Sequence, residues 1–233
     1  MRLGLWGWTA LAWMGVITAA LVDAIVLPGP PPATIKTLAS TPNIVSVHPA
    51  LHKGDPFPET IELREAEIKT TLSRTGGYTR SRFVLITDVD FYEVSSYVET
   101  PPTGSTNEML DSLWRDDGRK VYLLRFVISV PGWQLRKAVH DEIARSFDDV
   151  PLDEHRAEIE GLLKAFASGA SAGDVFYLAR SPGDRIHLGV RSEKNLDFVT
   201  SAPALTRAIW RMWAGPTAEP GRAGLVSRLQ ESP

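Results

Sequence analysis

The sequence predicts an α+β domain with a long antiparallel sheet and helices layered on one side of it. Predicted strands come first along the chain, two helices follow, and a hairpin and a further helix close the domain. An order of this kind places the helices together on one face of an antiparallel sheet. The chain of 233 residues is 43% hydrophobic and 23% charged, so it can bury a substantial core in one domain.

The predicted sheet rests on stretches rich in β-branched and aromatic residues. Residues 79–98 contain Phe83-Val84-Leu85-Ile86 and Phe91-Tyr92 with polar residues interspersed, which favours strands. Lys120 to Val130 forms a further strand, whose continuous apolar middle indicates burial on both faces. Residues 60–72, TIELREAEIKTTL, fit either a strand pair or a helix, because their periodicity matches neither pattern clearly.

Three helices are predicted from the spacing of apolar residues. Pro131 can open a helix without losing a hydrogen bond, and Leu135, Val139, Ile143 and Phe147 follow at a spacing of four. A second helix spans 153–168, with Gly169 as its terminator. The apolar residues on the inner face of this second helix are Ile159, Leu162, Leu163 and Phe166.

The stretch 173–216 completes the predicted fold. Ser181-Pro182-Gly183-Asp184 is a strong turn signal between two strands, because proline presets φ and glycine accepts a positive φ. A short strand comes next, and Ser201 is expected to cap a helix that contains Trp210 and Trp213, one in the core and one as a cover.

The amino terminus predicts export. Residues 3–22 contain no charged side chain and are about as long as a membrane-spanning helix. Val22-Asp23-Ala24 is also an acceptable small-residue cleavage site, so residues 1–24 fit a signal peptide or a membrane anchor. In both cases we expect a periplasmic or extracytoplasmic domain, with residues 3–22 as its contact with the inner membrane.

A proline-rich spacer is predicted between this segment and the domain. Eight of the seventeen prolines lie from Pro28 to Pro58, and such a composition favours extended polyproline conformation over helix. The predicted organisation is therefore a signal peptide or anchor over 1–24, a spacer over 25–57 and the domain over 58–230.

Composition and motifs exclude several classes of function. The chain has no cysteine, which removes disulfides, thiolate catalysis and cysteine-based metal sites. Its net charge of −3 gives no reason to expect a nucleic-acid partner. His48 and His52 have a metal-binding spacing only on a helix, which Pro49 disfavours, so we expect no metal and no cofactor. Gly169 to Gly173 matches G-x-S-x-G, but a helix precedes this motif where a nucleophile elbow needs a strand.

Residues 60 to 229 resemble the chalcone isomerase-like superfamily. Arg82, then Phe91-Tyr92, then Ser95-Ser96-Tyr97-Val98 look like three consecutive segments of that family. The strand and helix from Phe126 to Phe147, and the stretch 173–216 with its Trp-bearing end, follow in the family's order. The resemblance implies an open-faced β-sandwich. Among its members the chain looks most like the bacterial ones and is closer to the noncatalytic branch, which binds fatty acids.

The resemblance also implies a ligand site. Arg82 corresponds to an arginine that reaches the ligand cleft in the family, and Tyr92 to a tyrosine that shares the contact with a fatty-acid carboxylate. A shift of the alignment by two residues would give this role to Arg80. The enzymes' catalytic Tyr and Asn fall at about Leu135 and Glu142, so we expect no catalytic residue for chalcone cyclisation. The expected partner is a small hydrophobic or amphipathic acid.

Two other functions remain open at this point. An isomerase or lyase of intramolecular type could use Arg82 to stabilise developing negative charge. Such an enzyme also needs a general acid or base. Tyr92 and Tyr122 are candidates, but the sequence does not show where they lie relative to Arg82. Alternatively, the domain is an interaction module of the cell envelope that binds no small ligand.

Overall fold

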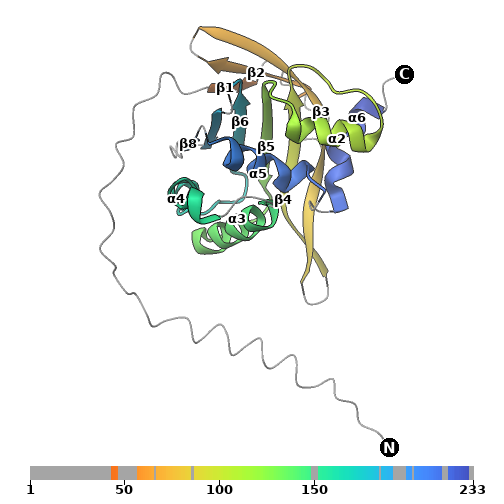
Figure 1. Cartoon of the computed structure of the whole chain (residues 1–233). Helices are drawn as coiled ribbons and strands as arrows, with labels where there is room; N and C mark the ends of the chain where they lie inside the picture. Colours follow the sequence, from red (N-terminus) through yellow and green to blue (C-terminus); the bar gives the residue numbers. More distant parts are fainter. Residues whose placement is uncertain are drawn as a thin grey trace, which may run out of the picture. The chain divides into compact units, whose positions relative to one another are not determined.

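The computed structural model describes most of the predicted domain (Figure 1). The described residues are 43–46, 57–65, 67–84, 87–147, 152–183, 185–190, 198–200, 202–216 and 220–230. All of them fall within one compact unit that spans residues 39–233. The predicted signal peptide or anchor over 1–24 and most of the predicted spacer lie outside the described residues. None of the described helices is both long enough and apolar enough to cross a membrane.

Eight strands form one antiparallel sheet in which each strand pairs with the next along the chain. Their bounds are β1 Asn43–Ser46, β2 Thr60–Glu65, β3 Ile68–Val84, β4 Thr87–Val98, β5 Lys120–Phe126, β6 Val175–Ser181, β7 Arg185–Val190 and β8 Phe198–Thr200. This meander confirms the predicted antiparallel sheet. It also decides between the two alternatives for residues 60–72, which form the β2–β3 strand pair.

Strand β1 differs from the predicted organisation, because it lies inside the proposed spacer. Its four residues pair with β2, from Asn43 opposite Arg64 to Ser46 opposite Ile61. The proline content of the chain predicted an extended spacer over residues 25–57. Residues 43–46 contain no proline, so their amide groups can join a sheet edge.

The long strand β3 changes the face on which its residues lie. A register shift between Arg74 and Gly76 leaves Thr75 as an extra residue against β4. Because side chains alternate along a strand, one extra residue moves the following ones to the opposite face. Leu72 therefore belongs to one core cluster, whereas Tyr78 packs against the other.

The described helices are α2 Thr106–Arg115, α3 Gly132–Ser146, α4 Arg156–Ala165, α5 Pro203–Ala214 and α6 Ser227–Gln230, with 3-10 turns η1 at Leu152–His155 and η2 at Pro220–Val226. In Figure 1, α3, α4 and α5 lie on one side of the sheet, as predicted. The predicted stripe on α3 is confirmed for Leu135, Val139 and Ile143, which are buried, whereas Phe147 caps the end of the helix and is half-buried. On α4, Ile159 and Leu162 are buried.

Two clusters of buried side chains use opposite faces of the sheet. The larger one joins β4 to β7 with the helices, and its sheet residues include Val94, Tyr122, Phe126, Phe176 and Leu188. The smaller one joins Ile61 and Leu63 of β2 with Val121 and Leu123 of β5. Leu72 of β3, Tyr97 of β4 and Ala179 of β6 belong to the same cluster, so it runs across neighbouring strands on one face of the sheet.

Two details at helix ends depart from expectation. Helix α2 was not predicted, although Ser105 and Glu108 form a capping box at its start, a recognisable sequence signal. The N-cap of α5 is Ala202, which makes no side-chain cap, and Pro203 provides the first turn. Ser201 itself lies outside the described residues.

Trp210 and Trp213 are both buried, at 0% and 6% exposure, so neither serves as an outer cover.

Candidate functional site

Arg80 and Tyr92 lie directly opposite each other on β3 and β4. The face change at Thr75 places this pair on the helix-covered side of the sheet, in line with Tyr78 and Val94. Arg80 is 7% exposed, and Tyr92 is half-buried. An arginine side chain is seldom so buried without acidic or other acceptor groups around it.

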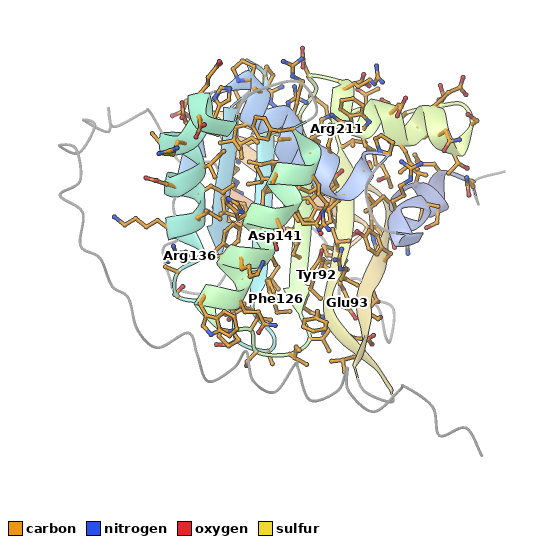
Figure 2. All side chains as sticks on the ribbon, turned by 60° about the horizontal axis from the view of Figure 1, so that its bottom comes forward. Tyr92, Glu93, Phe126, Arg136, Asp141 and Arg211 are labelled. Atoms are coloured by element: carbon orange, nitrogen blue, oxygen red, sulfur yellow. The ribbon has the colours of Figure 1, made fainter. Side chains whose placement is uncertain are left out.

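Tyr92 is held by one aromatic neighbour from the sheet and one from α5; Figure 2 labels it together with the first, Phe126. Its ring lies 5.9 Å from that of Phe126 on the neighbouring strand β5. Its hydroxyl oxygen accepts a hydrogen bond from the indole Nε1 of Trp213 on α5, at 3.1 Å.

Glu142 on α3 is an acidic partner of Arg80. The guanidinium Nη2 of Arg80 lies 3.4 Å from the Oε1 atom of Glu142. The same carboxylate oxygen lies 2.5 Å from Nη2 of Arg145, one turn further along α3. The family resemblance gives Glu142 only as the position where an enzyme has Asn, and nothing in the sequence indicates its contact with Arg80.

Arg82, the predicted ligand residue, lies two positions further along β3. Its backbone pairs with Val89 of β4, and a register shift between Arg80 and Ser81 separates it from the Arg80–Tyr92 pair. Its side chain lies outside the described part of the structure. The role predicted for Arg82 therefore stays a prediction, whereas the alternative, Arg80, is placed beside Tyr92.

Tyr122, considered above for acid or base chemistry, is embedded in the core under α5. Its ring lies 4.4 Å from that of Trp210 and 5.4 Å from that of Trp213. Its buried hydroxyl has no hydrogen-bond partner among the described residues, and burial raises its pKa far above the ordinary value. A hydroxyl in this environment is a poor general base at neutral pH.

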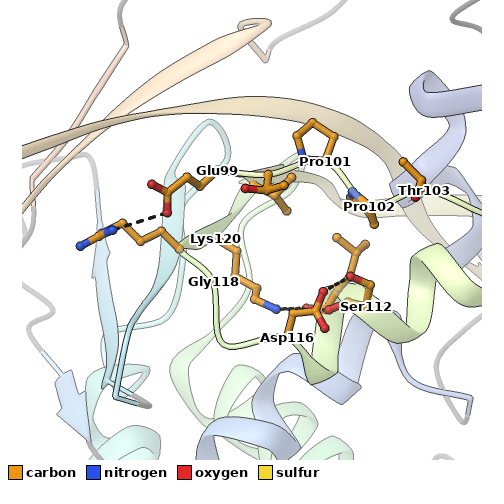
Figure 3. Close-up of a pocket in the computed structure, with 12 residues that line it drawn as sticks. Glu99, Pro101, Pro102, Thr103, Ser112, Asp116, Gly118 and Lys120 are labelled. Atoms are coloured by element: carbon orange, nitrogen blue, oxygen red, sulfur yellow. Dashed lines mark hydrogen bonds and ion pairs between the residues drawn. The ribbon is translucent and has the colours of Figure 1, made fainter.

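A separate pocket of about 470 Å³ opens at the other end of β4 and β5 (Figure 3). The residues 98–103 line one side of it and the end of α2 the other. Lys120 donates hydrogen bonds to the carbonyls of Leu113, at 2.7 Å, and Ser112, at 3.4 Å. Val98, opposite Lys120, is six residues from Tyr92 along β4, roughly 20 Å away. The pocket is therefore distinct from the Arg80–Tyr92 pair.

The charge at this pocket is unusual because Lys120 pairs in register with Arg180, another buried cation. Burial, with a further contribution from Arg180, lowers the pKa of Lys120 to about 7. The carboxylates of Asp116 and Asp117 oppose this shift. Both cations bind the carbonyl end of α2, since Arg180 also donates to the carbonyl of Asp116 at 2.9 Å.

No group of three His, Asp or Glu side chains converges into a metal site within the described residues. His48 and His52 lie outside them. Ser171, from the G-x-S-x-G match, is exposed between α4 and β6, so a helix leads into a strand there.

The amino-acid sequence matches no protein-family model and no curated protein. The fold, by contrast, is similar to a solved structure, that of a fatty-acid binding protein from Arabidopsis thaliana. The two share a TM-score of 0.56 at 14% sequence identity, over 70% of this chain and 91% of the plant protein. The likeness establishes the α+β architecture of the chalcone isomerase-like fold, as the sequence predicted.

Proposed function

We propose that this domain binds a small amphipathic acid of the fatty-acid type and does not catalyse chalcone cyclisation. The observation that carries the proposal is the buried Arg80 beside Tyr92, on the helix-covered face of a fold shared with a fatty-acid binding protein. The carboxylate head would bind Arg80 with Tyr92 in support. The alkyl chain would lie between the sheet and the helices.

The chemistry of the Arg80 region suits a carboxylate head on an apolar body. A guanidinium presents paired donors that match the two oxygens of a carboxylate, and partial burial strengthens such a bond. Apolar side chains of the larger core begin beside this pair, with Phe126 and Phe176 in contact at 5.0 Å between ring centroids. Ligand sites commonly combine a few polar groups with such an apolar wall.

The residues present speak against the enzymatic alternative. Leu135 and Glu142 stand where the resemblance places the enzymes' Tyr and Asn. Leu135 is buried in the core, and the carboxylate of Glu142 is paired with arginines. Neither side chain can serve as the tyrosine hydroxyl does in the enzymes.

The binding test uses displacement of the fluorescent fatty acid cis-parinarate by palmitate from the full-length chain. We expect Arg80→Ala to weaken palmitate binding by about tenfold to a hundredfold, since a hydrogen bond to a charged group contributes about 1.5–3 kcal/mol. Tyr92→Phe should weaken it by a smaller factor. Absence of palmitate binding by the wild type and by all variants would refute the proposed function.

Two arginine variants serve as matched controls. Arg125→Ala removes an arginine of β5 that pairs with Glu93 at 2.8 Å on the other face of the sheet, and palmitate affinity should not change. Arg82→Ala tests the residue that the sequence predicted. If Arg82→Ala abolishes binding and Arg80→Ala does not, the head group binds at Arg82. Circular dichroism of each variant confirms that it is folded.

We further propose that the domain acts outside the cytoplasm, with residues 3–22 as signal peptide or anchor. This rests on the uncharged run and the cleavage site described above. A fusion of residues 1–24 to a reporter that is active only after export should be active in a bacterial host. Replacing Leu11 and Val16 by Arg should abolish that activity, and an unchanged signal would refute export through this segment.

A further inference from the structure

One carboxylate oxygen of Glu142 lies between two arginines of very different exposure. The side chain of Arg80 is 8% exposed and that of Glu142 16%, whereas that of Arg145 is 58% exposed. Arg80 is an inner partner on the sheet, and Arg145 is an outer partner on the same helix as Glu142. The inner contact, at 3.4 Å, is longer than the outer one, at 2.5 Å.

The place beside Arg80 that suits a ligand carboxylate is therefore already next to a carboxylate of the protein itself. Two carboxylates cannot both lie against one buried guanidinium without repulsion in a medium of low dielectric. A bound acid would have to displace Glu142 from Arg80. The displaced side chain would not be left unpaired, because Arg145 lies on the solvent side within reach.

We propose that Glu142 is an internal competitor for the ligand's head group, an inference that rests on the proposed function. In the ligand-free protein Glu142 pairs with Arg80. When an acid binds, its carboxylate takes the place of Glu142 at Arg80, and Glu142 keeps only Arg145. The competition sets the affinity of the site for carboxylates and does not act on neutral ligands.

Because only charged ligands compete with Glu142, a change at this residue should alter the affinity for acids and leave the affinity for neutral lipids unchanged. Glu142→Gln keeps the size of the side chain and removes its charge, so the pairing with Arg80 weakens. We expect this variant to bind palmitate about tenfold more tightly than the wild type does. Its affinity for hexadecan-1-ol, which has the same chain length and no charge, should be unchanged.

The outer arginine supplies an independent test. Removing Arg145 leaves the displaced Glu142 without a partner, so Arg145→Ala should weaken palmitate binding severalfold. In the Glu142→Gln background the same substitution should have no effect on palmitate binding. This double-mutant cycle isolates the coupling between the two side chains.

The matched control is Asp141→Asn on the same helix (Figure 2). Asp141 is 46% exposed and pairs with Lys137 at 2.7 Å, so the variant removes one negative charge from α3 without touching Arg80. Its palmitate affinity should equal that of the wild type. A gain as large as that of Glu142→Gln would show a general charge effect and overturn the inference.

The remaining outcomes separate a failure of the Glu142 competition from a failure of the proposed function itself. If Arg80→Ala loses palmitate while Glu142→Gln binds it with wild-type affinity, the proposed function stands and the internal competitor is refuted. If Glu142→Gln binds palmitate and the wild type does so only weakly, both stand. If no variant, including Glu142→Gln, binds palmitate, the proposed function fails and the inference with it.

Discussion

At the scale of single residues, the notable feature away from the proposed ligand site is the pair of cations at the end of α2. Lys120 is 4% exposed and Arg180 1%, and the two pair across β5 and β6. Each satisfies backbone carbonyls that α2 leaves without partners at its C-terminal end. Holding a charged ammonium there costs stability, which is why the pKa of Lys120 falls.

The stability of the domain should therefore depend on the protonation of Lys120. Its pKa is lowered from 10.5 to about 7 in the folded state, so between these values the unfolded chain holds one more proton. The free energy of unfolding should consequently rise with pH over this window, by up to about 1.4 kcal/mol per pH unit. Urea unfolding of wild type and Lys120→Met from pH 6 to 10 measures this dependence.

The stabilisation is fully present only above pH 10.5 and is lost as the pH falls from 10.5 to about 7. In Lys120→Met this component of the pH dependence should vanish, while every other group titrates as before. The difference in unfolding free energy between the two proteins should therefore change with pH in favour of the wild type. Parallel curves over pH 7–10 would contradict a lowered pKa for Lys120.

At the proposed site, the sequence predicts which residues could bind a ligand but not which of them lie next to one another. Tyr92 was identified through its family resemblance, and the alternative Arg80 was identified with it. Their pairing depends on the extra residue Thr75 and on the register of β3 against β4. Glu142 lies 62 positions from Arg80 along the chain, and no local pattern indicates that the two side chains meet.

At the scale of elements, α3 begins where the chain leaving α4 passes closest to it. Val130 and Ala170 exchange backbone hydrogen bonds of 2.8 and 3.0 Å beside the first turn of α3. Gly169 takes a positive φ of 73° to make this approach, as expected of a helix terminator. Gly132 faces the same backbone, so a β-carbon there would lie 1.9 Å from the carbonyl oxygen of Ala167.

We expect Gly132→Ala to destabilise the domain by about 1–3 kcal/mol or more, because a backbone oxygen cannot move away as a flexible side chain can. The matched control is Gly118→Ala, since a β-carbon at Gly118 meets nothing within 4 Å. Its stability should stay within about 0.5 kcal/mol of the wild type. Thermal unfolding followed by circular dichroism compares the two, and equal melting temperatures would contradict the close approach.

Some helices and strands could be predicted from their local sequence, and others could not. The stripe on α3 has a spacing of four that requires no tertiary information, and three of its four predicted residues are buried; the fourth, Phe147, follows the helix as its C-cap and is half-buried. Helix α2 has a clear capping box but is short, and it was missed. For residues 60–72 the pairing of β2 with β3 decided the structure, because hydrogen bonds to a neighbouring strand outweigh a weak local preference.

At the scale of the whole molecule, the sheet has a cluster of buried side chains on each face. The smaller cluster contains Ile61 and Leu63 of β2 and Val121 and Leu123 of β5, with Leu72 of β3 and Tyr97 of β4 from the strands between them. Tyr97 is fully buried on this side, and its hydroxyl donates to the carbonyl of Pro58 at 2.7 Å. The start of the predicted domain, near residue 58, is thus bonded directly to a residue of the smaller cluster.

The contribution of β1 can be measured by truncation. Residues 39–233 include β1, and residues 57–233 lack it and leave β2 as the edge of the sheet. We expect the shorter chain to fold, because Phe57 and all described core residues remain, and to melt several degrees lower. Equal melting temperatures would show that the domain needs only the residues 58–230 predicted from the sequence.

The sequence by itself determined the fold class, the hairpin with its following helix, and most of the buried stripe of α3, because these follow from local periodicity and turn chemistry. It also proposed Tyr92 with Arg82, or alternatively Arg80, as ligand-binding residues, which stays a prediction. The tertiary structure alone decided that Arg80 lies on the helix-covered face and that Glu142 meets it. Register, an extra residue at Thr75 and the docking of α3 set those contacts, and each depends on residues far apart in the chain.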